Sequence, residues 1–108
     1  MNGSFEIREF VENGCSPYAE WHDTLDSVTA ERVDRYMLRL EQGNSGAVKT
    51  LPVGVFEMRM DFGPGYRVYF GRAGRALIIL LGGGSKRRQD ADIAAAVERW
   101  KRYKQTKR

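Results

Sequence analysis

The stretch GVFEMRMDFGPGYRVYF, residues 54–70, constrains the fold of this chain more than any other. Two runs in which apolar and polar residues alternate flank Gly63-Pro64-Gly65. Alternation with a period of two residues is typical of strands that bury one face, and a glycine- and proline-rich tripeptide between two such runs is typical of a hairpin loop. The sequence therefore predicts a β-hairpin closed by a three-residue loop.

Pairing across this loop sorts the side chains of the hairpin into two faces. With Phe62 opposite Tyr66, one face carries only apolar side chains and belongs to the core. This register places Arg59 opposite Tyr69 on the other face. That polar face carries Glu57, Arg59, Asp61, Arg67 and Tyr69. Two interpretations stay open: a solvated face with cross-strand ion pairs, or an anion site, because guanidinium groups suit phosphate oxygens and a tyrosine can stack on a base.

The remaining segments complete an α+β fold with the order β-α-α-β-β-β-α. We expect a small twisted antiparallel sheet with an N-terminal helical hairpin and a C-terminal helix. Further expected elements are a strand over Phe5–Val11, a helix from Pro17 to about Asp26, a helix capped by Thr29 and ended by Gly43-Asn44, a short edge segment at Lys49–Val53, a central strand at Ala76–Leu81 that is covered on both faces and broken by Gly82-Gly83-Gly84, and a helix from Asp90 to about Lys104.

Length and cysteine content restrict the classes of protein to which the chain can belong. Its 108 residues predict a single domain, residues 1–108. Cys15 is the one cysteine, so neither an internal disulfide nor a cysteine-based zinc site is expected, and we expect no metal. No run approaches the ~20 apolar residues of a membrane span, so we expect no membrane contact and a cytoplasmic location.

Positive charge is concentrated at the end of the chain. The formal net charge is +4, yet the last 24 residues hold nine basic and three acidic residues. Within them, GGGSKRRQ follows the end of the expected central strand and opens a helix, where free backbone N–H groups and the helix dipole favour an anion. We expect Lys86 of this loop to converge with Arg59 and Arg67 around a single pocket for a nucleotide phosphate.

At these residues the chain resembles the RelE/ParE toxin superfamily, and most closely its HigB-like branch of phage-derived addiction-module killer proteins. The resemblance rests on GVFEMRMDFGPGYRVYF and LIILLGGGSKRRQDADIAAA, with support from Trp21, Leu25 and Lys49. It implies a RelE-like fold and the toxin of a type II toxin–antitoxin pair. The implied activity is ribosome-dependent cleavage of mRNA without a metal or other cofactor. The implied partners are mRNA, the ribosome and a HigA-like helix-turn-helix antitoxin that binds the toxin as a hetero-oligomer.

The same resemblance implies roles for individual residues. The candidate catalytic residues are Arg67, Arg59, Lys86, Tyr69 and Asp92, and the candidate RNA-binding residues are Lys49, Arg87, Arg88 and Tyr66. In the implied reaction a ribose 2′-OH attacks its own 3′-phosphate, cations hold the developing charge, and other groups move protons. Tyr69, Asp92 and Glu57 stay open as proton carriers. Because Arg67 is expected on an exposed face, Arg67→Ala is expected to abolish toxicity and leave the fold intact.

Two alternatives stay open beside the nuclease. Where RelE-type toxins often carry a tyrosine or histidine near the final helix, this sequence has Asp92. The ParE side of the superfamily inhibits DNA gyrase and needs no hydrolytic residue, so a gyrase inhibitor is the first alternative. The second is an attenuated member whose polar face only binds its antitoxin.

Overall fold

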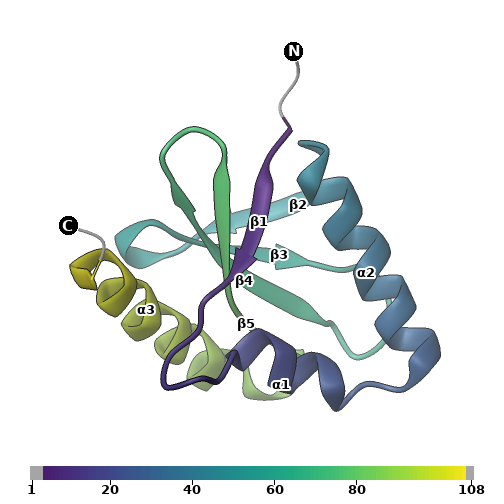
Figure 1. The fold of residues 1–108 in the computed structure, drawn as a ribbon. Coiled ribbons are helices and arrows are strands. Elements are labelled where there is room, and N and C mark those ends of the chain that lie inside the picture. The colour runs from purple at the N-terminus through teal and green to yellow at the C-terminus, as the bar shows by residue number, and fades with distance from the viewer. Residues whose placement is uncertain (1–3, 107–108) are drawn as a thin grey trace.

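The computed structural model describes residues 4–106, in which a five-stranded sheet lies between two layers of helices (Figure 1). The strands are β1 (Glu6–Glu9), β2 (Ala47–Thr50), β3 (Val55–Arg59), β4 (Arg67–Ala73) and β5 (Leu77–Gly84). The helices are α1 (Pro17–Asp23), α2 (Ser27–Glu41) and α3 (Gln89–Thr106), with short 3₁₀ turns η1 (Pro52–Gly54) and η2 (Lys86–Arg88). The predicted α+β class is confirmed. An edge strand forms at Ala47–Thr50, two residues before the expected segment, whose residues 52 and 53 lie in η1 instead.

The sheet is mixed, with the strand order β1-β5-β4-β3-β2. The strands β2 to β5 pair antiparallel with their neighbours, as predicted, whereas β1 pairs with β5 in parallel. The prediction of a wholly antiparallel sheet is therefore corrected at this edge. A hairpin turn forces antiparallel pairing, but β1 and β5 lie at opposite ends of the chain and share no hairpin, so no turn sets their direction.

The hairpin of β3 and β4 has a longer loop than the three residues predicted. Arg59 pairs with Arg67 rather than with Tyr69, and the Met60 N–H donates to the Tyr66 carbonyl at 2.9 Å, which leaves five residues in the loop. Contacts with α2 hold two of these five: the Tyr36 hydroxyl accepts from the Asp61 N–H at 3.2 Å, and the rings of Tyr36 and Phe62 stack. The register is shifted by two residues, an even number, so the predicted division into two faces is unchanged.

Strand β5 continues through the three glycines that were expected to break it. It reaches Gly84, with an irregularity in register where Tyr69 pairs with Gly82 and Phe70 pairs with Leu80. Two of the three glycines, Gly83 and Gly84, are needed for space rather than for a turn. A Cβ at Gly83 would collide with the ring of Trp21 from α1, and a Cβ at Gly84 would collide with the carboxylate of Asp92 from α3. The triplet therefore lets helices approach the sheet from both sides.

Two helix starts show how side chains set the ends of elements. The Ser16 hydroxyl caps α1 by accepting the Ala19 N–H at 3.1 Å, and Pro17 follows in the first turn, as predicted. The predicted cap of α2 is wrong. The Asp26 carboxylate accepts the Thr29 N–H at 2.7 Å, so this helix begins at Ser27 and Thr29 lies inside it.

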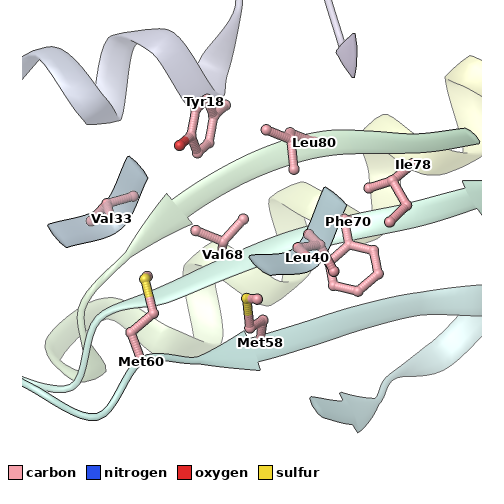
Figure 2. Packing of buried hydrophobic residues seen from close by; sticks show 9 residues of the cluster. All are labelled: Tyr18, Val33, Leu40, Met58, Met60, Val68, Phe70, Ile78 and Leu80. Carbon is pink, nitrogen blue, oxygen red and sulfur yellow. The ribbon is translucent and has the colours of Figure 1, made fainter. Parts of the chain in front are cut away.

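Apolar side chains cover both faces of the sheet. On one face (Figure 2) Tyr18 of α1 and Val33 and Leu40 of α2 lie over the sheet. The sheet residues of this cluster are Met58, Met60, Val68, Phe70, Ile78 and Leu80. On the other face Ala96 and Trp100 of α3 belong to a second cluster, and Ile79 and Leu81 contribute to it from β5. The predicted two-sided burial of β5 is therefore confirmed.

The close approach of α3 to the sheet at Gly71 gives a direct test of this packing. A Cβ at Gly71 would lie 2.5 Å from the Trp100 ring, and the backbone there is an ordinary strand. We expect Gly71→Ala to lower the free energy of unfolding by about 1–3 kcal/mol through overpacking, measured by urea denaturation. Thr50→Ala, at an exposed position of β2, should change it by less than about 0.5 kcal/mol. Equal stability of the two variants would contradict this packing.

Candidate functional site

Three cations line one pocket on the α3 side of the sheet. The pocket has a volume of about 290 Å³. It is lined by Ala47, Val48, Lys49, Glu57, Arg59, Arg67 and Gln89. Directly paired residues of neighbouring strands point to the same face, so the pairing of Arg59 with Arg67 and of Lys49 with Glu57 explains why these side chains meet. We call this hollow the cation pocket.

Arg67 is buried, which corrects its predicted exposure. Its relative exposure is 7%, and the Gly65 carbonyl and the Glu57 carboxylate lie against its guanidinium. Nη1 donates to the Gly65 carbonyl at 2.6 Å, and Nε lies 3.5 Å from Oε2 of Glu57. Nη2 takes part in neither contact.

Glu57 is the buried carboxylate of this pocket, with a relative exposure of 4%. Besides facing Arg67, its Oε2 accepts a hydrogen bond from Nε2 of Gln89 at 2.9 Å. Gln89 is the first residue of α3 and was not among the predicted site residues. A glutamine at a predicted helix start carries no sequence signal that it will bond a residue 32 positions earlier.

The other predicted basic residues lie next to the cation pocket rather than in it. Lys86, Arg87 and Arg88 line an adjacent hollow of about 440 Å³, and Gln89 borders both. The base of the Lys86 side chain nevertheless lies near Arg67. A Cβ at Gly65 would contact both Nη1 of Arg67 and the Cβ of Lys86. Lys107 and Arg108 of the predicted basic segment lie outside the described residues.

Tyr66 and Asp92 line a third hollow, of about 390 Å³, at the end of β5. Trp21 and Arg88 border the same hollow, which places Arg88 against two of the three hollows. Burial raises the pKa of the Asp92 carboxyl, and the nearby charges of Arg88 and Arg99 only partly oppose this shift. Asp92 therefore holds a proton to higher pH than an ordinary aspartate.

Tyr69 is fully buried, does not line the cation pocket, and its hydroxyl has no hydrogen-bond partner among the residues that the structure describes. Burial, and next the charges of Glu57 and Asp92, raise the pKa of its phenol, so the hydroxyl stays neutral at physiological pH. Its position opposite Glu57 in the sheet places it behind the residues that line the pocket. Tyr69 therefore neighbours Glu57 inside the protein rather than at the surface of the pocket.

Neither a metal-binding cluster nor a membrane-spanning helix occurs in the described part of the chain. Among residues 4–106, no group of three or more histidine, cysteine, aspartate or glutamate side chains is placed to hold a metal ion. The three helices within the same range are too short or too polar to cross a membrane.

Comparison with known proteins identifies a relative. A protein of Haemophilus influenzae, described as an uncharacterized protein, is 40% identical over 80 residues, which cover 73% of this chain and 81% of that protein. This chain belongs to the same family. No model of a known protein family matches the sequence. Among solved structures, a mutant of the E. coli toxin RelE in the free state is similar, with a TM-score of 0.65 and 11% identity, over 89% of this chain and 97% of that one. The chain therefore has a RelE-like fold.

The burial of Arg67 in this RelE-like fold changes what its removal should do. Arg67→Ala would leave the Glu57 carboxylate buried beside no cation, so we expect the free energy of unfolding to fall by about 3–5 kcal/mol, measured by urea denaturation. Arg35→Ala, which removes an exposed arginine of α2 with an i,i+4 ion pair, should cost less than about 1 kcal/mol. An Arg67→Ala variant as stable as Arg35→Ala would show that the pair is not buried.

The raised pKa of Asp92 predicts a pH-dependent stability. The native state holds this proton more tightly than the unfolded chain does, so the contribution of Asp92 falls as pH rises from the unfolded value of 3.8 through the folded pKa. We expect Asp92→Asn to raise the free energy of unfolding at neutral pH, and the gain to vanish below pH 3.8. Urea titrations at several pH values, with exposed Asp90→Asn as the control, would check this. A gain that grows on acidification would contradict it.

Proposed function

We propose that this protein is the toxin of a type II toxin–antitoxin pair, in the HigB-like branch of the RelE/ParE superfamily, and that it cleaves mRNA on the ribosome. The observation that carries the proposal is the convergence of Lys49, Arg59 and Arg67 on one pocket in a RelE-like fold. Two guanidinium groups and an ammonium group suit the oxygens of one backbone phosphate, which is the reacting group in RNA cleavage.

In the proposed reaction no side chain of the protein forms a covalent bond to the RNA. The 2′-hydroxyl loses its proton to solvent water as its oxygen forms a bond to the adjacent phosphorus. The bond from phosphorus to the 5′-oxygen breaks, that oxygen takes up a proton, and the products are a 2′,3′-cyclic phosphate and a 5′-hydroxyl. Negative charge builds on the phosphoryl oxygens in the transition state. Arg59 and Lys49 reach them from exposed positions, and Arg67 offers Nη2.

Proton transfer to the leaving 5′-oxygen is assigned to Asp92. Its raised pKa lets the carboxyl hold a proton to higher pH than an ordinary aspartate, and Gly84, over which its carboxylate lies, pairs with Arg67 in the sheet. Asp92 lines the neighbouring hollow rather than the cation pocket, over the strand that pairs with β4. Tyr69 is buried and supports Glu57 and Arg67 without reaching the substrate.

The proposed toxin has its partners in the cytoplasm. The toxin acts as a single domain in the cytoplasm, where mRNA and ribosomes are found. Its antitoxin is a HigA-like helix-turn-helix protein that binds it in a hetero-oligomer. The basic hollow of Lys86, Arg87 and Arg88 beside the cation pocket supplies a path for the RNA backbone that enters the site.

Regulated expression tests the activity. We expect expression of the protein in E. coli to stop growth and to produce cleavage within codons of a reporter mRNA, read by primer extension. Arg59→Ala should reduce cleavage by about 10²–10³-fold, because it removes one charge-stabilising group from an exposed position and leaves the Arg67–Glu57 pair intact. Arg35→Ala is the matched control and should cleave like the parent protein.

Other outcomes would replace this proposal. Growth arrest with a DNA-damage response and intact mRNA would favour inhibition of DNA gyrase. Normal growth with folded protein present would leave antitoxin binding as the activity of this surface.

A further inference from the structure

We propose that Glu57 and Gln89 are positioning residues for Arg67: they hold its guanidinium so that Nη2 faces the cation pocket. The contacts that define this arrangement are independent of the activity, whereas its effect on turnover rests on the proposed function.

One nitrogen of the Arg67 guanidinium makes a hydrogen bond, and a second lies within ionic contact of a carboxylate. Nη1 is bonded to the carbonyl of Gly65, two residues away in the loop that leads into β4. Nε is buried and lies 3.5 Å from Glu57 Oε2, a distance that is long for a hydrogen bond and within reach of an ionic contact. The two side chains are among the few buried charged groups of residues 4–106, so solvent does not weaken their attraction.

Gln89 sets the orientation of Glu57. Its amide nitrogen donates to the same oxygen, Oε2, that faces Arg67. Because Gln89 opens α3, this bond joins the start of that helix to the middle of the sheet, and Gln89 itself borders the cation pocket. Tyr69, paired with Glu57 on the next strand, closes the inner side. The carboxylate is thus fixed by the helix and in turn fixes the arginine.

A carboxylate at the edge of an anion pocket works against binding. Its negative charge repels a phosphate that enters, so removal of the charge should strengthen binding. If Glu57 positions Arg67, the same change should slow the chemical step, because a displaced guanidinium no longer meets the transition-state charge. Opposite effects on affinity and turnover separate positioning from a purely structural role, in which both would worsen.

Glu57→Gln is the primary test, since glutamine keeps the shape of the side chain and loses the charge. We expect the variant to bind a non-cleavable oligonucleotide, 2′-deoxy at the cleaved position, about tenfold more tightly. We expect its single-turnover cleavage rate at saturation to fall about 10²-fold. The shape of the pH–rate profile should be unchanged, whereas loss of its acidic limb would identify Glu57 as a general base and overturn the positioning role.

Gln89→Leu is the second variant, because it removes the bond to Glu57 and keeps the carboxylate. Its cleavage rate should fall without any gain in affinity. Exposed Glu31→Gln on α2 removes a charge far from the pocket and should match the parent protein in both measurements.

Two readouts remain meaningful if the parent protein cleaves no RNA. In ¹⁵N NMR the Arg67 Nε–H should be protected from solvent exchange, and this protection should be lost in Glu57→Gln and in Gln89→Leu. Inorganic phosphate should bind Glu57→Gln more tightly than the parent. An Arg67 signal that is unchanged in both variants, or phosphate affinity that falls in Glu57→Gln, would overturn the inference. Absence of cleavage with both NMR and phosphate results as expected would refute only the nuclease.

Discussion

The contact between Arg67 and Glu57 is the constraint on which the arrangement of this molecule depends. Both charged side chains are buried on the adjacent strands β3 and β4. A buried ion that lacks a partner costs far more free energy than a buried pair, so the two residues must remain together while α3 is docked. Gln89 then connects the start of α3 to the same carboxylate. Packing and the charged pocket are therefore one structural unit.

Missing side chains are as important here as present ones. Gly71 lets Trp100 lie flat against β4, and the glycines at the end of β5 leave room for Trp21 on one face and Asp92 on the other. With a Cβ at these positions the helices would lie farther from the sheet. Asp92 would then be displaced from its place over Gly84, the residue that pairs with Arg67. The glycine triplet thus serves the site through close packing and not as a phosphate-binding turn.

The exposed cations and the buried arginine contribute differently to the proposed chemistry. Lys49 and Arg59 are exposed, so their side chains can follow a moving phosphate with little effect on the fold. Arg67 is held by its neighbours, so its position is set before a ligand arrives. Preorganised charge is the more effective kind in a transition state, because no reorganisation is needed when the charge develops. A pocket that contains both kinds can capture an anion and then hold it in one geometry.

Local patterns in the sequence determined the class of fold and much of the pocket. Period-two alternation in the hairpin assigned Glu57, Arg59, Arg67 and Tyr69 to one face, and this survived a register shift of two residues because side chains alternate with a period of two. Tertiary structure alone decided the loop length, the parallel pairing of β1, the course of β5 through its glycines, and the burial of Arg67. These features depend on contacts between segments far apart in the chain, such as Tyr36 with Asp61 or Gln89 with Glu57, and local periodicity carries no information about which distant side chains will meet.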